Sequence, residues 1–242
     1  LHKEYRRQRQ MCIRDSLSQP HLIKMSNQLI NRPPKLVTIV TQSIRKSIVE
    51  GELPLGEYIA EERIAATLGV SRTPVREALM SLQFQGLVET APPRGAYVFK
   101  PSYDEVVKLS EFRMFMELQA LTLAAGNQLQ KLLTDLRRAT AAMRTAAAHA
   151  DRLGYGKADA EFHDALFASC ENPYLTEAYQ LTSGRFDTLR NFLSGRLSER
   201  SPSPADDHDQ IIDAIAEGRL EAGKTLLADH ILRMAKNYKA AL

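Results

Sequence analysis

The chain has 242 residues, of which 44% are hydrophobic and 25% are charged, and such proportions are typical of a globular protein with one large or two small domains. No apolar run approaches the roughly 20 residues that a membrane-spanning helix needs. The N-terminal stretch also lacks the uninterrupted apolar segment of a secretory signal. We therefore expect no membrane partner and a cytoplasmic location.

Residues 1–34 differ from the rest of the chain. They contain seven basic and two acidic residues and account for the chain's net charge of +3. Within them, Met11–Ser16 resembles the translation of a sequencing-library adaptor, which would make everything before about Ser16 an assembly artefact and Met25 the true start. The alternative is a basic arm that contacts DNA. We expect an artefactual or disordered tail and leave it out of the fold.

Helical periodicity begins after this tail. Leu36, Val40 and Ile44 recur at helical spacing, and Gly51 with Pro54 ends the predicted helix.

Two shorter helices follow, joined by a tight turn. In the first, Ile64 and Leu68 share one face, and Gly69 allows the left-handed conformation that often ends a helix. The Ser71 hydroxyl can then accept a hydrogen bond from the backbone of the second helix, and apolar residues follow on one stripe: Val75, Ala78, Leu79 and Leu82. The pattern predicts a helix-turn-helix, whose second helix enters the major groove of DNA.

Two short strands, Leu87–Ala91 and Ala96–Phe99, come next and are joined through Pro92–Gly95. We expect residues 35–100 to form a winged helix-turn-helix domain of three helices and a small β-hairpin. This segment contains eight basic and seven acidic residues. Because its net charge is small, the basic residues that contact phosphates must be gathered on the DNA-binding surface. The motif and the hairpin turn supply Arg63, Arg72, Arg76 and Arg94. The alternative is that these arginines are only solvated surface residues.

From residue 101 to residue 242 the chain is rich in Ala and Leu, with no β-rich run. Helical segments are separated by Gly154–Gly156, Glu171–Pro173, Arg200–Pro204 and Gly218. This spacing predicts about six helices in an all-α bundle.

Four polar groups of this bundle lie on apolar helix faces. Asp159 and His163 are one helical turn apart, whereas His208 and His230 belong to two further helices. A carboxylate and three imidazoles that converge in this way make a divalent transition-metal site of the Zn, Ni or Mn type, with coordination positions left for water or a ligand. The alternative is a set of hydrogen-bonded core histidines.

Two arginines are candidates for contact with an effector. Arg113 lies on the apolar face of the first bundle helix, so its guanidinium needs an acid, either Glu117 or a ligand carboxylate. Arg185 lies between Leu181 and Leu189 and is a similar candidate. An internal salt bridge is the alternative for both.

The winged segment resembles a known family. Leu53–Gly56, Ile59–Glu62, Leu68–Leu79 and Gly86–Val88 resemble the DNA-binding domain of GntR-type bacterial transcription regulators. The resemblance implies that DNA is contacted by Arg63, Ser71, Arg72, Thr73, Arg76 and Gly95. Among them, Arg72 is the candidate for bidentate reading of a guanine edge, Arg63 and Arg76 for base or phosphate contacts, and Ser71 and Thr73 for phosphate oxygens.

The helical segment resembles the effector-binding and dimerisation (FCD-like) domain of the FadR-type branch of this family. The resemblance is carried by Glu111–Arg113, Asp159–His163, Asn172–Leu175, Ile211–Gly218 and Asp229–Ile231. A subset of the family binds metal through the positions of this Asp and these three His. The resemblance implies a homodimer that binds a pseudo-palindromic double-stranded DNA operator.

The leading hypothesis is a ligand-responsive transcription regulator that senses a small organic acid at or near its metal. The resemblance implies repression that the ligand relieves, and activation is the alternative. The alternative is a metal-dependent hydrolase or lyase that uses the Asp/His₃ site to activate water. A structural metal clamp without an effector is the third hypothesis.

Overall fold

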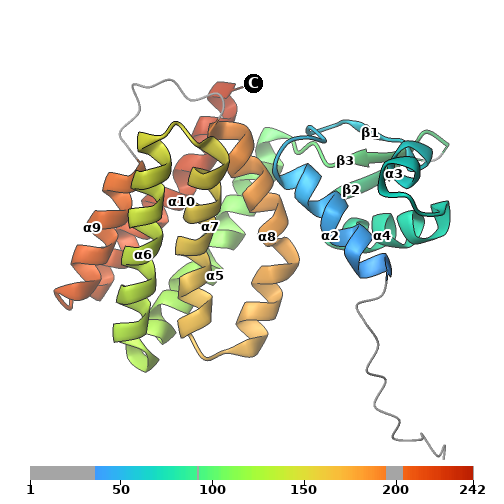
Figure 1. Cartoon of the computed structure of the whole chain (residues 1–242). Helices are drawn as coiled ribbons and strands as arrows, with labels where there is room; N and C mark the ends of the chain where they lie inside the picture. The colour runs from blue at the N-terminus through green and yellow to red at the C-terminus, as the bar shows by residue number, and fades with distance from the viewer. Residues whose placement is uncertain (1–35, 92, 195–203, 242) are drawn as a thin grey trace, which may run out of the picture. The chain divides into compact units, whose positions relative to one another are not determined.

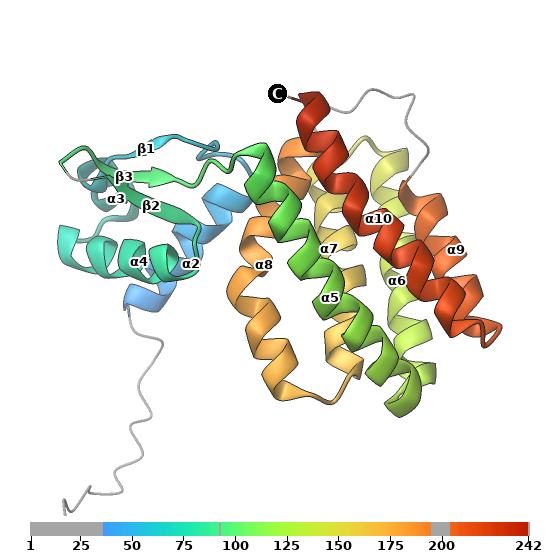
Figure 2. The ribbon, with the colours of Figure 1, turned by 180° about the vertical axis from the view of Figure 1, so that it is seen from behind.

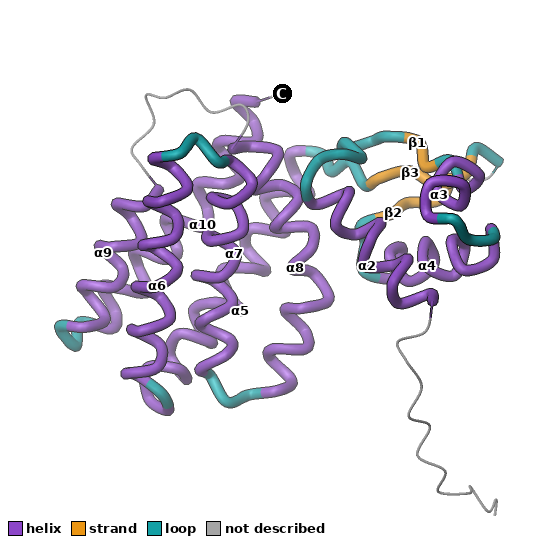
Figure 3. Tube along the Cα trace, viewed as in Figure 1, coloured by secondary structure: helices purple, strands orange, loops and turns teal. Residues whose placement is uncertain are grey.

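A computed structural model describes residues 36–91, 93–194 and 204–241 of the chain. Within these ranges it has nine α-helices and one three-stranded sheet (Figure 1). The strands are confined to the first part of the described chain, and only helices follow (Figure 3). The predicted fold class, a winged helix-turn-helix followed by an all-α bundle, is confirmed. The expected tail at residues 1–34 lies outside the described residues, and the division at residue 100 stays a prediction.

The first part contains three helices and three strands. Its elements are α2 (Leu36–Val49), β1 (Tyr58–Ile59), α3 (Glu61–Leu68), α4 (Arg72–Phe84), β2 (Val88–Ala91) and β3 (Gly95–Val98). The antiparallel sheet has the order β1-β3-β2, with Tyr58 opposite Tyr97 and Thr90 opposite Ala96. The sequence did not predict β1, because two residues are too short a run to show a strand periodicity.

The turn between α3 and α4 depends on Gly69. This residue ends α3 in the left-handed conformation with a φ of 65°, and its N–H bonds back to the helix. Ser71 occupies the N-cap of α4 in extended conformation, as predicted, but its side chain makes no capping hydrogen bond. The predicted hydroxyl cap is therefore wrong, and the Ser71 side chain is exposed instead.

The helices of the first part bury one apolar face each. Helix α2 packs against α4 and contributes Val40, Ile44 and Ile48, while α4 contributes the stripe that the sequence predicted: Val75, Ala78, Leu79 and Leu82. Because α4 has this face in the core, its opposite face is presented to solvent.

The second part consists of six helices within the described residues. They are α5 (Tyr103–Asn127), α6 (Leu129–Ala148), α7 (Arg152–Ser169), α8 (Pro173–Ser194), α9 (Pro204–Ala216) and α10 (Leu220–Ala241). Helix α7 packs against α5, α6 and α8, while α10 packs against α5 and α9 (Figures 1 and 2). Helix α5 begins with a capping box, in which the Glu105 N–H donates to Ser102 Oγ at 3.3 Å and the Ser102 N–H donates to Glu105 Oε2 at 2.7 Å.

No helix in the described ranges combines the length and the apolar character that a membrane span requires.

The bundle core should determine the stability of the second part. Leu121 on α5 is fully buried, so Leu121→Ala should lower the free energy of unfolding by about 2–5 kcal/mol through lost burial and a residual cavity. The matched control is Leu153→Ala, because Leu153 on α7 is 49% exposed, and its effect should stay within about 0.5 kcal/mol. Urea denaturation followed by circular dichroism measures both. Equal losses of unfolding free energy in the two variants would contradict the burial of Leu121 in the bundle core.

Candidate functional site

Helix α4 presents a polar face at its N-terminal end. The side chains of Arg72 and Arg76 are 49% and 58% exposed, and Ser71 and Thr73 are exposed beside them. The arginines are one helical turn apart and therefore project from the same side of α4, away from the buried stripe. The structure thus brings together four of the residues that the sequence selected for DNA contact.

Two acids of α3 face these arginines, and sequence reasoning missed both. Glu61 Oε2 lies 2.7 Å from Arg76 Nε and 3.2 Å from Arg72 Nη2. Glu62 Oε1 lies 2.8 Å from Arg72 Nη1. The hydrogen bond from Arg76 lowers the pKa of Glu61, so this carboxylate is ionised at neutral pH. The pairs could not be found from spacing, because they depend on the angle at which the turn joins the two helices.

Arg63 lies on a different side of α3. It lines a surface hollow of about 190 Å³ together with residues of α2 and the following loop: Ser43, Ile44, Ser47, Glu52 and Leu53. Arg63 is therefore not part of the arginine and glutamate cluster formed by Glu61, Glu62, Arg72 and Arg76.

The turn between β2 and β3 carries the two remaining predicted DNA contacts. Arg94 and Gly95 are both exposed there. Gly95 has a φ of 102°, and a Cβ atom at this position would lie 2.9 Å from Tyr58 Cε2. Both the backbone conformation and the adjacent ring therefore require glycine at this point.

The bundle brings together the four predicted metal ligands. Asp159 and His163 come from α7, His208 from α9 and His230 from α10. One ligand atom from each side chain lies within 4.8 Å of all the others. His163 and His208 are fully buried and Asp159 is 5% exposed. The cluster therefore combines three nitrogen donors and one oxygen donor in a dry part of the bundle, which is a donor set that Zn, Ni or Mn accepts.

Carboxylates next to two of the histidines orient their rings. His163 Nδ1 lies 2.6 Å from Glu117 Oε2, and His230 Nδ1 lies 3.5 Å from Asp207 Oδ2. Carboxylates in such positions hold a histidine so that its other nitrogen is free for a metal. His163 Nε2 and both ring nitrogens of His208 are buried and have no hydrogen-bond partner among the described residues. Buried polar atoms of this kind are rare in native proteins, so these atoms fit a metal.

The charges in the cluster favour the protonation states that a metal needs. Burial alone would raise the pKa of Asp159, but Arg190 and the three histidines lower it below its usual value. Burial lowers the pKa of His208 to about 3. At neutral pH the cluster therefore holds an ionised carboxylate and a neutral imidazole, and neither has to lose a proton before it can bind a cation.

Two buried arginines flank the cluster. Arg113 Nε lies 2.6 Å from Glu117 Oε1, which is the internal salt bridge that the sequence left open. Arg190 on α8, which sequence reasoning missed, pairs with Asp159 and donates from Nη1 to Asp187 Oδ1 at 2.8 Å. The Nη2 atoms of both arginines are buried and lack a hydrogen-bond partner among the described residues. Each guanidinium therefore keeps an unused N–H group that could donate a hydrogen bond to an anionic oxygen.

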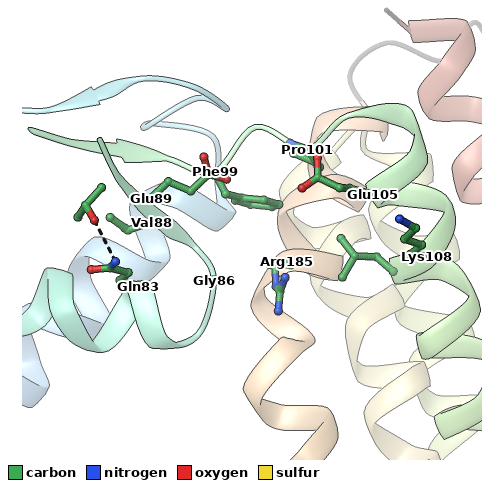
Figure 4. Close-up of a pocket in the computed structure, with 11 residues that line it drawn as sticks. Gln83, Gly86, Val88, Glu89, Phe99, Pro101, Glu105, Lys108 and Arg185 are labelled. Carbon is green, nitrogen blue, oxygen red and sulfur yellow. Dashed lines mark hydrogen bonds between the residues drawn. The ribbon is translucent and has the colours of Figure 1, made fainter. Parts of the chain in front are cut away.

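Arg185, the other predicted effector contact, lies apart from this cluster. It lines a hollow of about 650 Å³ together with Gly86, Glu105 and Lys108 (Figure 4). A Cβ atom on Gly86 would lie 2.8 Å from Arg185 Cζ. The neighbours of Arg185 are therefore a tight backbone turn, an acidic residue and a basic residue, and the predicted metal ligands are not among them.

Two families match the chain. Residues 36–98 match the bacterial regulatory proteins of the gntR family, and residues 108–233 match the FCD domain. The first match includes α3, α4 and the hairpin turn, and the second includes all four clustered ligands.

The chain is also similar to individual members. It is 33% identical, over 81% of its own length and 84% of the relative's, to a probable D-xylose utilization operon transcriptional repressor of Paenarthrobacter nicotinovorans. It is 23% identical, over 72% of its length and 70% of the relative's, to a gluconate operon transcriptional repressor of Bacillus licheniformis.

Solved structures show the same fold. A GntR transcriptional regulator from Rhodococcus sp. RHA1 superposes with a TM-score of 0.74 at 25% identity, covering 85% of this chain and 98% of that one. McbR/YncC from E. coli gives 0.73 at 22% identity over 84% of this chain and 97% of that one. The chain belongs to the GntR family of bacterial transcription regulators, in the branch with an FCD domain, whose members bind DNA and are not enzymes.

Proposed function

We propose that the protein is a ligand-responsive repressor that binds a DNA operator and senses a small organic acid in its helical part. The observation that carries the proposal is the exposed pair of arginines at the start of α4, which lies in the segment that matches the gntR family. A helix that has one face in the core and arginines at its exposed N-terminal end is suited to enter the major groove.

The DNA contacts in this proposal come from three places. Arg72 reads a guanine edge, Arg76 contacts a base or a phosphate, and Ser71 and Thr73 bind phosphate oxygens. Arg94 and Gly95 approach the backbone or the minor groove from the turn between β2 and β3. Arg63 keeps its predicted role as a base or phosphate contact, although it lies on another side of α3.

Repression is supported by two relatives that are described as repressors of operons for D-xylose utilization and for gluconate. An acidic effector is supported by the unused donors of the buried site. Arg113 Nη2 and Arg190 Nη2 have no partner among the described side chains, and a carboxylate would satisfy such a donor. Arg185 remains a separate candidate for effector contact.

A divalent metal of the Zn, Ni or Mn type would be held by Asp159, His163, His208 and His230. When bound, it supplies a Lewis-acidic centre with coordination positions for water or an effector oxygen. Glu117 and Asp207 fix the rings of His163 and His230 for this purpose.

We also propose a homodimer, in which two winged parts read a pseudo-palindromic operator. The interface would lie in the helical part. Phe112 and Phe115 on α5 are 38% and 67% exposed, and they lie one turn apart on the same helix face. A second copy would cover this apolar surface.

The metal-dependent hydrolase or lyase alternative has no support. Asp164, the acid next to His163 in the sequence, reaches solvent and is not one of the clustered ligands, although partial desolvation and the neighbouring Asp187 raise the pKa of its carboxyl to about 6. Asp209, next to His208, pairs with Arg144. Neither acid is placed as a general base beside the cluster. The structural clamp stays open, and the metal experiment below tests it.

Arg72→Ala should weaken operator binding by about 1–3 kcal/mol and relax specificity at one base position, because it removes a bidentate contact. The operator is first obtained by selecting duplexes from a random pool with the wild-type protein, and affinities are then measured by fluorescence anisotropy. Lys46→Ala serves as the control, because Lys46 on α2 is exposed and far in sequence from the motif. Equal losses on the operator and on random duplex would reduce Arg72 to a phosphate contact.

Removal of a metal ligand should abolish metal-dependent stabilisation. Added Zn²⁺, Ni²⁺ or Mn²⁺ should raise the melting temperature of the wild type, because a bound metal links three helices. His208→Ala should lose most of this increase. His149→Ala is the matched control, because His149 is exposed and bonds only to the backbone of its own helix. No stabilisation by any of the three metals would count against the site.

The same variants separate a sensor from a clamp. In the sensor, a small carboxylic acid that releases the wild type from its operator should have little effect on His208→Ala and Arg113→Ala, although both still bind the operator. Release of His208→Ala at the wild-type effector concentration would leave the metal with a structural role only.

Phe115→Glu should shift the protein from dimer to monomer, because it places a charge in an apolar interface. Phe84→Glu is the matched control, because Phe84 on α4 is 82% exposed and outside the helical part. Sedimentation velocity of the full chain at micromolar concentration measures both. A dimer that survives Phe115→Glu would place the interface on another surface.

A further inference from the structure

We propose that Glu61 is a positioning residue for DNA recognition, whose carboxylate holds Arg72 and Arg76 ready for base contact and thereby sets the preference for the operator over random DNA. The inference rests on the proposed role of these two arginines as DNA contacts. It assigns a function to an acid on a surface that binds a polyanion, where a negative charge would otherwise only oppose binding.

The geometry shows one carboxylate oxygen shared by two arginines. Glu61 Oε2 accepts from Arg76 Nε at 2.7 Å and from Arg72 Nη2 at 3.2 Å. Glu61 lies on the first turn of α3 and its side chain is only 27% exposed, so its position is set by the packing of α3 against α4. A side chain on one helix therefore fixes two side chains on the next helix across the turn.

The bonds leave suitable donors for DNA. Arg76 donates to Glu61 through Nε, and in the described part of the chain its terminal amino groups donate no hydrogen bond. Both amino groups can therefore meet two acceptors of one base edge. Arg72 has a second partner, because its Nη1 lies 2.8 Å from Glu62 Oε1. Glu62 is 65% exposed and could be displaced by DNA while Glu61 stays in place.

Two physical effects of Glu61 raise specificity. An arginine that is already held in one conformation loses less rotational freedom when it binds, and this benefit is realised only where base acceptors match its position. The negative charge of Glu61 also weakens attraction to phosphates, which is the same for every duplex. Removal of the carboxylate should therefore weaken operator binding and leave binding to random duplex unchanged or tighter.

Glu61→Gln tests the proposal, with the full chain, a duplex selected from a random pool by the wild type, and a shuffled duplex of equal length. The ratio of the two affinities should fall about tenfold, while the melting temperature changes little. Glu62→Gln is the matched control, because it removes the same charge from the next residue but releases only Arg72. Its effect on the ratio should be clearly smaller. Glu61→Asp keeps the negative charge, so its ratio of the two affinities should lie between those of Glu61→Gln and the wild type.

A double-mutant cycle shows whether Glu61 acts through the arginines. In a chain that already carries Arg72→Ala and Arg76→Ala, Glu61→Gln should not lower the ratio further. Two results would overturn the inference. One is an unchanged ratio of operator to shuffled-duplex affinity when Glu61→Gln is made in the wild type. The other is an equal fall of this ratio when Glu61→Gln is made in the chain that lacks Arg72 and Arg76. The arginine substitutions alone check the proposed DNA contacts. If they leave the ratio unchanged, the proposed contacts fail first and the role of Glu61 fails with them.

Discussion

The helical part depends on the buried carboxylate of Asp159. An ionised carboxylate in a dry interior is costly unless an opposite charge and polar groups surround it. Here the opposite charge is Arg190 on α8, and the imidazoles of α7, α9 and α10 are the polar groups around it. These partners lie far apart in the sequence, so the carboxylate can be accommodated only when four helices are in place. The site is therefore a consequence of the whole bundle rather than of one local motif.

Glu117 has the same role at a second point of the bundle. One of its oxygens accepts from Arg113 and the other contacts His163. Arg113, Glu117 and His163 form a continuous path of buried polar contacts from α5 to the proposed metal ligands on α7. An anion that binds the unused Nη2 of Arg113 would disturb the guanidinium that neutralises Glu117, and through Glu117 it would disturb the ring of His163. This path of contacts is the physical means by which the proposed acidic effector would act on the cluster.

The sequence predicted those features that depend on periodicity within one helix. Asp159 and His163 could be paired because residues one turn apart share a face, and the end of α3 could be placed because Gly69 tolerates a positive φ. Contacts between helices were not predictable in the same way. The pairing of Glu61 with Arg76, and of Arg190 with Asp159, depends on crossing angles that no local pattern encodes. Helical periodicity placed Arg185 on an apolar helix face, as it did Arg113. In the structure the guanidinium of Arg185 lies beside Gly86 and not beside the clustered histidines.

The two groups of ion pairs differ in how solvent acts on them. The arginine and glutamate contacts on α3 and α4 are partly exposed, so salt screens them and their individual contribution to stability is small. The more exposed partner, Glu62, can be exchanged for DNA at little cost. The ion pairs around Asp159 and Glu117 are buried, so removal of one partner leaves the other as an uncompensated buried charge. Weak ion pairs at the surface suit a protein that must release and rebind DNA. Strong buried ion pairs suit a site that must keep its geometry.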